Sequence, residues 1–363
     1  MDYERLMKRA LQLAKRAEGE TAHYPMVGAL LVKNGEIISQ GYFKKPGEPH
    51  AEVKAIEKAG SNARGATLIL NLEPCAHYGT TPPCTEAIIR AGIKKVVAGM
   101  IDPNPLVCGK GFKRLRSAGI EVVSGVLEKE SRWLNRHFVK YITTGLPWVI
   151  LKLASTIDGK IADRFGNSKW ISGEEARKYV HQLRKKVQVV MVGIGTVLKD
   201  DPQLTVRLVP TKNQPRALVI DSRLKIPLSA QVLSRSGTII ACRSDARTNK
   251  QKQLKKIGAE IITTTSDSSG KVNLRQLMRK LGKKKIASLL CEGGAHLAGE
   301  LLEQGLVDEL HFIFAPMLLP DCKSLPLTMG KAPWKLNRAI SLYQPGFRRL
   351  GKDFLFTALL REG

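Results

Sequence analysis

The chain has 363 residues, of which 43% are hydrophobic and 25% are charged. This composition is typical of a globular protein and excludes a disordered chain, and the length predicts two domains. No apolar run approaches the roughly 18 residues that span a bilayer, which excludes a helical membrane protein. The net charge of +27 indicates attraction for anions in general, whether nucleic acid, phosphorylated metabolites or acidic membrane surfaces.

The first 20 residues predict an amphipathic helix, because Leu6, Ala10 and Leu13 recur at helical spacing. Charged residues interrupt every apolar stretch in this segment, so we do not expect a signal peptide. Six cysteines are dispersed along the chain. In a protein of this length without a secretion signal, reduced thiols and a cytoplasmic location are expected.

Residues 26–42 predict a β-hairpin, because two apolar runs flank Asn34-Gly35, the strongest two-residue turn signal. Helices and strands then alternate, which indicates an α/β sandwich. The elements predicted after the hairpin are a helix at 50–60, a strand at 66–75, a helix at 84–92, a strand at 94–100, a helix at 109–119, a strand at 120–126 and a helix at 128–144. The Gly-Leu-Pro break at 145–147 predicts a boundary between a domain of residues 1–145 and a domain of residues 146–363.

A metal site is indicated by His50, Cys75 and Cys84, which offer three ligands suited to zinc and leave a fourth position open, as in catalytic sites. Zinc lowers the pKa of a bound water to roughly 7, and Glu52 is placed to take that proton and return it to a leaving amine. H-x-E followed by P-C and a second Cys is the zinc-deaminase signature, although eight residues separate the two cysteines here. The alternative is a closed structural site with His77 as fourth ligand, which would leave Glu52 unexplained.

The second half also reads as α/β. Its predicted elements are a strand at 147–156, a helix at 173–186, strands at 187–193, 216–221, 237–243, 259–264 and 286–291, a helix at 295–305 and a strand at 308–316. Residues 243–285 are polar and lysine-rich, and we interpret most of this stretch as a surface excursion. Gly193 and Gly195 lack a third glycine at position 198, so a Rossmann fingerprint is absent. The turn at Gly293-Gly294 is either an anion site at a helix start or an ordinary tight turn.

Several motifs resemble the bifunctional riboflavin-biosynthesis deaminase–reductases of bacteria. In the first half these are HAE at His50, the run EPC-x-H-x-G-x-TPPC ending at Cys84, and DPNP-x-V-x-G-x-G starting at Asp102. In the second half they are LKLASTIDGKIA, SKWISGEEAR, VGIGTVLKDDPQLTVR and CEGGAHLAGELLEQGLVDEL. The resemblance implies an N-terminal cytidine-deaminase-like α/β/α sandwich followed by a dihydrofolate-reductase-like α/β domain, a fold that binds NADPH without the Rossmann fingerprint.

The resemblance also implies an activity and a set of site residues. The activity is zinc-dependent hydrolytic deamination of 2,5-diamino-6-(5-phosphoribosylamino)pyrimidin-4(3H)-one, then NADPH-dependent reduction of the ribosyl group to ribityl, in a homo-oligomer. The implied NADPH contacts are Ala154, Trp170, Thr196, Asp200, Ser222, Gly293 and Gly294. The implied substrate contacts are Ser168, Arg184, Leu204, Arg207, Glu292, Asn104 and His77, with Gly79 and Thr81 shaping the zinc loop.

One departure concerns the loop before the first strand, where relatives carry Pro-Asn-Pro and this chain has His23-Tyr24-Pro25. A phenol cannot offer the paired donor and acceptor of an amide, so we expect an altered contact with the pyrimidine.

Two other interpretations of the function stay open. A nucleic-acid base deaminase is favoured by the charge of +27 and the zinc signature, and an inactive or retargeted deaminase half beside a working reductase rests on Tyr24 alone. His137, His181 and His311 are interpreted as ordinary residues, because no ligand partner lies nearby in sequence.

Overall fold

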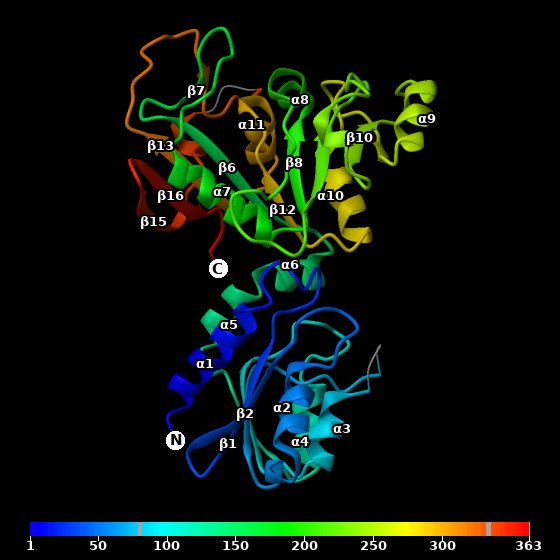
Figure 1. Cartoon of the computed structure of the whole chain (residues 1–363), viewed down its shortest axis with the longest axis vertical. Coiled ribbons are helices and arrows are strands. Elements are labelled where there is room, and N and C mark those ends of the chain that lie inside the picture. Colours follow the sequence, from blue (N-terminus) through cyan, green and yellow to red (C-terminus); the bar gives the residue numbers. More distant parts are fainter. Residues whose placement is uncertain (79–81, 332–334, 363) are drawn as a thin grey trace. The chain divides into compact units, whose positions relative to one another are not determined.

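The computed structural model describes residues 1–78, 82–331 and 335–362, and the chain divides into two compact units, Met1–Gly145 and Leu146–Gly363 (Figure 1). Each unit has its own sheet and its own hydrophobic clusters. None of the helices in the described ranges is long and apolar enough to cross a membrane.

In the described part of the first unit, five strands form a sheet in the order β2-β1-β3-β4-β5. β1 is antiparallel to both of its neighbours, whereas β3, β4 and β5 are parallel. The elements are α1 Tyr3–Lys15, β1 Gly28–Lys33, β2 Glu36–Tyr42, α2 Ala51–Ala59, β3 Thr67–Leu72, α3 Cys84–Arg90, β4 Lys95–Met100, α4 Lys110–Ser117, β5 Glu121–Ser124, α5 Glu128–Leu134 and α6 Arg136–Thr144.

Successive side chains of each strand point to opposite faces of this sheet, and both faces are buried. Leu30 packs with α1 on one face, and Leu31 packs with α2, α3 and α4 on the other. The predicted hairpin is confirmed: Asn34 and Gly35 have φ values of 52° and 84°, as a two-residue type I′ turn requires. The result is an α/β/α sandwich in which two different sets of apolar side chains cover the sheet.

Two glycines let helices lie directly on the sheet backbone. A Cβ atom at Gly28 would collide with the carbonyl oxygen of Ala10 in α1, and one at Gly41 would collide with that of Ala51 in α2. Because α2 begins at Ala51, its close seating on β2 fixes the position of the helix start.

The single helix predicted at 128–144 is two helices, because the chain breaks at Asn135. The side chain of Asn135 accepts a hydrogen bond from the backbone N–H of Met26 (2.7 Å) and donates one to its carbonyl oxygen (3.1 Å). A side chain that reaches a loop 109 residues away leaves no trace in helical periodicity, which explains why the break was not predicted.

In the described part of the second unit, nine strands form a sheet in the order β11-β10-β9-β8-β12-β6-β13-β16-β15. The strands from β11 to β13 are parallel, and β16 and β15 close one edge antiparallel. The elements are β6 Trp148–Thr156, β7 Lys160–Ala162, α7 Glu174–Lys186, β8 Val189–Gly193, α8 Ile194–Asp200, β9 Arg216–Ile220, β10 Ile239–Arg243, α9 Thr248–Lys256, β11 Glu260–Thr264, α10 Leu274–Lys283, β12 Ser288–Cys291, α11 Ala295–Glu303, β13 Glu309–Ala315, β14 Leu325–Pro326, β15 Tyr343–Leu350 and β16 Asp353–Leu359.

This sheet is also buried on both faces. Along β6, Ile150 packs with Leu183 of α7, while Leu151 packs with Leu277 of α10 and Leu301 of α11. Consecutive residues of one central strand therefore belong to opposite cores, as expected of a parallel sheet covered by helices.

The interpretation of residues 243–285 as a surface excursion is wrong. The segment forms α9, β11 and α10. The strand predicted at 259–264 is confirmed as β11, which pairs in parallel with β10. Leu274, Leu277 and Leu281 of α10 are buried, and the lysines that dominate the composition lie on the outer faces of these elements. A narrow apolar stripe on a charged helix was enough to build a core contact.

Candidate active sites

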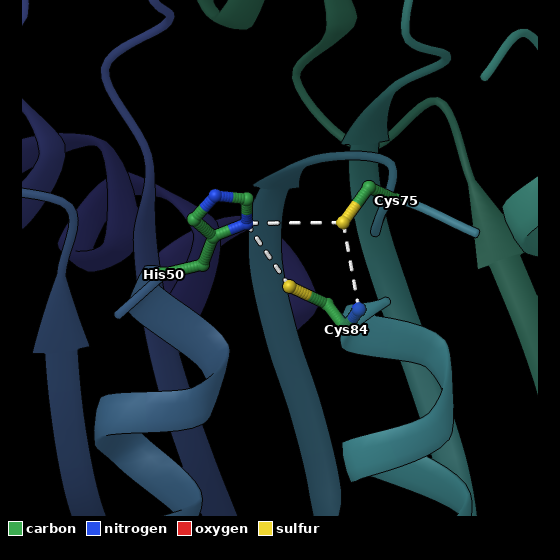
Figure 2. Close-up of side chains that lie close together, drawn as sticks. All are labelled: His50, Cys75 and Cys84. Carbon is green, nitrogen blue, oxygen red and sulfur yellow. Dashed lines mark hydrogen bonds between the residues drawn. The ribbon is translucent and has the colours of Figure 1, made fainter. Parts of the chain in front are cut away.

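In the first unit, three ligand atoms converge where α2, α3 and the end of β3 meet (Figure 2). His50 precedes α2, Cys75 follows β3, and Cys84 is the first residue of α3. His50 Nδ1 lies 3.0 Å from Cys84 Sγ and 3.8 Å from Cys75 Sγ. In the described ranges these three residues form a group whose ligand atoms all lie within 4.8 Å of one another, and His77 does not belong to it. The donor set of one imidazole and two thiols fits zinc with a position left open.

Glu52 lies in the first turn of α2, two residues after His50, and is only 3% exposed. Its Oε2 atom accepts no hydrogen bond from any described residue. Burial raises the pKa of Glu52, while the nearby His50 opposes that shift. A buried carboxylate oxygen without a partner is costly unless it serves a ligand or a proton transfer, so Glu52 also fits an occupied metal site.

The two thiols have opposite proton affinities. The hydrogen bond from the Cys84 thiol lowers the pKa of Cys75 to about 4, against the effect of burial. The backbone N–H of Cys84 also points at Cys75 Sγ, at 3.4 Å. The same hydrogen bond, together with burial, raises the pKa of Cys84. The pair thus resembles one thiolate that shares the proton of a neighbouring thiol, which a divalent cation would displace.

Other residues of the deaminase motifs build the surrounding loops. Glu73 is buried and accepts hydrogen bonds from the backbone N–H groups of Asp102 (3.2 Å), Gly109 (2.9 Å) and Phe112 (3.2 Å), so it ties the two motifs together. Asn104 accepts a hydrogen bond from Leu106 N–H through Oδ1 (3.1 Å).

Four further positions of the deaminase motifs lie in these loops. His77 Nδ1 is buried and has no hydrogen-bond partner within the described ranges. Burial raises the pKa of Asp102 to about 7. The predicted loop-shaping residues Gly79 and Thr81 lie outside the described residues.

Tyr24, the departure noted in the sequence, belongs to a row of aromatic rings that ends at the metal group. Its ring centroid lies 4.2 Å from that of His23 and 6.1 Å from that of Phe43, and Phe43 lies 5.5 Å from His50. The Tyr24 ring therefore contacts Phe43, which in turn contacts His50, at the position where the family resemblance implies an amide.

The second unit contains a cavity of about 890 Å³ at the carboxyl ends of β6, β8, β9 and β12. All seven predicted NADPH contacts line it: Ala154, Trp170, Thr196, Asp200, Ser222, Gly293 and Gly294. Of the predicted substrate contacts, Ser168 and Glu292 also line it, whereas Arg184, Leu204 and Arg207 do not. A crevice at the carboxyl ends of parallel strands is the usual ligand site of such sheets.

Arg184 does not line the cavity but forms an ion pair with Glu292, which does. Its Nε and Nη2 atoms donate to the two carboxylate oxygens of Glu292, at 2.6 and 3.1 Å, and both side chains are nearly buried. Arg207 differs: it is exposed, and its Nη1 atom donates to Gln203 (3.3 Å) and Thr205 (3.0 Å). The structure therefore separates two arginines that the sequence analysis treated alike.

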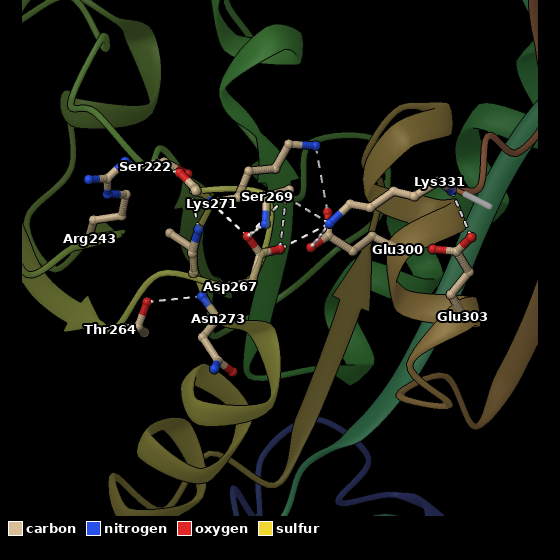
Figure 3. A network of polar contacts seen from close by, with 12 residues as sticks. Ser222, Arg243, Thr264, Asp267, Ser269, Lys271, Asn273, Glu300, Glu303 and Lys331 are labelled. Atoms are coloured by element: carbon tan, nitrogen blue, oxygen red, sulfur yellow. Dashed lines mark hydrogen bonds and ion pairs between the residues drawn. The ribbon is translucent and has the colours of Figure 1, made fainter.

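One wall of the cavity is held by a polar network that contains Lys331 (Figure 3). Lys331 Nζ contacts Asp267 Oδ2 (2.9 Å) and Glu300 Oε1 (3.2 Å), and its backbone N–H donates to Glu303 (2.7 Å). Although burial opposes it, hydrogen bonds from Lys271 N–H and Lys331 hold the pKa of Asp267 well below its usual range. The network fixes the loop at 266–272 beside the predicted contact Ser222.

Ser222 accepts a hydrogen bond from Val272 N–H through Oγ (3.1 Å), which leaves the hydroxyl proton free to donate. The residue before it, Asp221, is 1% exposed and accepts the backbone N–H of Ile226 (2.8 Å). Lys152, in the middle of β6, lines the cavity, and burial lowers its pKa. Sequence reasoning missed Lys152, although a lone lysine in an otherwise apolar buried strand is a signal that could have identified it.

Comparison with known proteins gives two family matches. Residues 1–100 match the cytidine and deoxycytidylate deaminase zinc-binding region, and residues 147–355 match the RibD C-terminal domain. The second match covers more than half of the chain. The chain belongs to the RibD family of riboflavin biosynthesis proteins. The predicted resemblance and the predicted fold class, a cytidine-deaminase-like unit followed by a reductase unit, are confirmed.

The similarity to members of this family extends over the whole chain. The riboflavin biosynthesis protein RibD of Aquifex aeolicus is 46% identical over 88% of both chains, and that of Bacillus amyloliquefaciens is 40% identical over 99% of this chain and 97% of its own. The crystal structure of a diaminohydroxyphosphoribosylaminopyrimidine deaminase/5-amino-6-(5-phosphoribosylamino)uracil reductase from Thermotoga maritima is 37% identical, covers 98% of each chain and superposes with a TM-score of 0.87.

Proposed function

We propose that this chain catalyses two consecutive steps of riboflavin biosynthesis. Residues 1–145 deaminate 2,5-diamino-6-(5-phosphoribosylamino)pyrimidin-4(3H)-one, and residues 146–363 reduce the ribosyl group of the product to ribityl with NADPH. The Thermotoga maritima relative is named for both activities. The observation that carries the proposal is the group of His50, Cys75 and Cys84 with the buried, unpartnered carboxylate oxygen of Glu52 at the start of the same helix.

In the deaminase half, His50, Cys75 and Cys84 would hold zinc, which when bound would activate water at neutral pH. Glu52 accepts a proton from the attacking water and delivers it to the leaving 2-amino group. The C2–O bond forms first. The C2–N bond then breaks as the amino group takes the proton from Glu52, and ammonia leaves. The raised pKa of Glu52 suits this exchange, because a proton shuttle works best when its pKa lies near the operating pH.

His77 and Asn104 contact the substrate in this half. The proposal for His77 is supported by its buried Nδ1 atom, which has no partner in the described part of the chain and can serve a ligand. The proposal for Asn104 is supported by its amide group, because the hydrogen bond with Leu106 uses Oδ1 and leaves Nδ2 for another acceptor.

In the reductase half, the residues that would hold NADPH line the cavity at the carboxyl ends of β6, β8, β9 and β12: Ala154, Trp170, Thr196, Asp200, Ser222, Gly293 and Gly294. Gly294 precedes α11 without a side-chain cap, so the free N–H groups of this helix suit a pyrophosphate. When bound, the cofactor would supply a hydride to C1 of the opened ribose, and Asp200 or a water would supply the proton. Glu292 is unsuited to that step, because, although burial opposes it, the ion pair with Arg184 lowers the pKa of the carboxyl group. Ser168, Leu204 and Arg207 contact the substrate, and Arg184 holds Glu292 through its ion pair.

We also propose a homo-oligomer in the cytoplasm. All six cysteines lie within the described residues and are free, as a reducing compartment requires. Sedimentation equilibrium tests the oligomeric state, and a mass equal to one 40.0 kDa chain would contradict it.

The function is tested by following ammonia release and NADPH oxidation together with zinc-replete protein. The diaminopyrimidine ribosyl phosphate should release ammonia first and oxidise NADPH afterwards. NADPH oxidation only with the deaminated intermediate would mean that the zinc half is inactive or retargeted, and an RNA oligonucleotide would be the next substrate. Absence of both reactions would refute the proposal.

A further inference from the structure

The segment at 203–208 carries two predicted substrate contacts and has an unusual backbone. Leu204 has a φ of 53°, a conformation that residues with side chains rarely adopt, and its side chain is 2% exposed. Such a conformation is strained and persists only where the surroundings fix it. The segment must therefore be held by contacts outside its own sequence.

Three side chains provide these contacts through the segment's backbone. His181 Nδ1 accepts the N–H of Arg207 (2.8 Å), and Arg184 Nη1 donates to the carbonyl oxygen of Thr205 (2.9 Å). Gln214 uses both ends of its amide on one residue: Oε1 accepts the N–H of Val206 (2.7 Å), and Nε2 donates to its carbonyl oxygen (2.9 Å).

His181 and Arg184 are three residues apart on α7 and so project from one face of that helix. His181 is 5% exposed, and burial, Arg184 and Arg207 lower its pKa to about 4, while Glu292 acts in the opposite direction. The ring is therefore neutral at physiological pH. Nδ1 can then accept the N–H of Arg207, which an imidazolium could not do.

Arg184 and Arg207 therefore have different roles. The Nε and Nη2 atoms of Arg184 form a fork that Glu292 already occupies, and Nη1 donates to Thr205, so that fork is not open to a phosphate. The guanidinium of Arg207 is exposed, and its direction depends on the backbone at 205–207. Arg207 is thus the arginine of this pair that can grip a phosphate with two parallel hydrogen bonds.

We infer that His181, Arg184 and Gln214 are positioning residues of the reductase site: they fix the backbone of residues 204–208 and thereby aim Arg207 at the 5′-phosphate of the substrate. The inference rests on the proposed reductase function. It assigns a role to His181, in place of the interpretation as an ordinary residue, and to Gln214, which belongs to none of the recognised motifs.

The test compares His181→Leu with His181→Asn in the full-length protein. Leucine removes the acceptor, whereas the asparagine Oδ1 atom stands where Nδ1 stood and can still accept the N–H of Arg207. Leaving that N–H unpaired should raise the KM for the deaminated intermediate about tenfold. The KM for NADPH should not change, and His181→Asn should stay close to wild type. Gln214→Ala, at the surface, should also raise the KM and serves as the second variant if His181→Leu folds poorly.

A double-mutant cycle with Arg207→Ala separates this inference from the proposed function. If His181 acts through Arg207, adding His181→Leu to Arg207→Ala should raise the KM no further. Additive effects, or an unchanged KM in both His181→Leu and Gln214→Ala, would overturn the inference while leaving the function intact. Failure of the wild-type protein to oxidise NADPH with the deaminated intermediate would refute the function itself.

Discussion

At the scale of single residues, Glu52 shows how burial and chemistry are linked. A carboxylate that is 3% exposed, with one oxygen unpartnered among the described residues, destabilises a fold unless it has another use. Its position at the start of α2 places it beside His50 without making it a member of the ligand group. The proposed role in proton transfer explains both the position of Glu52 and why a destabilising buried carboxylate is present there.

Replacing Glu52 with glutamine should therefore abolish proton transfer and leave the metal in place. We expect kcat for ammonia release to fall about 10²- to 10⁴-fold, the usual contribution of a general acid–base group. Zinc content, measured by inductively coupled plasma mass spectrometry, should stay at the wild-type level. Glu57→Gln is the matched control, because Glu57 is exposed on the same helix. Loss of zinc from Glu52→Gln would point to a structural role instead.

Tyr24 supports a second residue-scale prediction. Because the family resemblance implies an amide at this position, Tyr24→Asn should raise the deaminase kcat/KM about tenfold, the value of one or two well-made hydrogen bonds. Tyr24→Phe keeps the ring beside Phe43 and removes only the hydroxyl, so it should behave like the wild type. An unchanged kcat/KM in Tyr24→Asn would show that residue 24 does not contact the base.

The residues of the site differ in how well the sequence predicted them. His50, Cys75 and Cys84 follow from spacing, because few side chains bind zinc and their motif is local. His181 does not, since its role depends on a backbone N–H 26 residues away that no pattern encodes. Residues that bind directly are predictable by type, whereas residues that position others become visible only in three dimensions.

At the scale of elements, the seating of α2 on β2 determines where the metal group forms. No side chain separates Gly41 from the helix start, so the backbone of α2 lies against the strand. Adding a methyl group there must move the first turn of α2, and with it His50 and Glu52.

Gly41→Ala should accordingly lower both zinc retention and ammonia release. NADPH oxidation with the deaminated intermediate should be unchanged, because the reductase unit has its own core. Glu57→Ala, exposed on the same helix, provides the control. The prediction fails if Gly41→Ala retains wild-type zinc after gel filtration.

The elements themselves were predicted well where local pattern dominates. The hairpin at Asn34-Gly35 and the amphipathic helix α1 are encoded by turn chemistry and spacing. The break at Asn135 was not predicted, because it depends on a hydrogen bond with a distant loop. The core contact of α10 was not predicted either, because its few buried apolar residues lie in a sequence dominated by lysines. Tertiary contacts overrode composition in both cases.

At the scale of the whole molecule, two units with separate cores hold two separate sites. The two activities should therefore respond separately to removal of the metal. Treatment with a strong zinc chelator should abolish ammonia release and leave NADPH oxidation with the deaminated intermediate intact. Added zinc should restore ammonia release. Parallel loss of both activities would contradict independent sites.

The alternation along β6 also determines where the chain can change in length. Ile150 and Leu151 face opposite cores, so deleting one residue before them would exchange the two faces of the strand and turn the cavity side chains of residues 152–154 toward the wrong layer. An insertion at the Asn34-Gly35 turn reverses no strand face. Insertions and deletions among relatives should accordingly collect in such turns and spare the central strands, so the register of β6 limits how these sequences diverge.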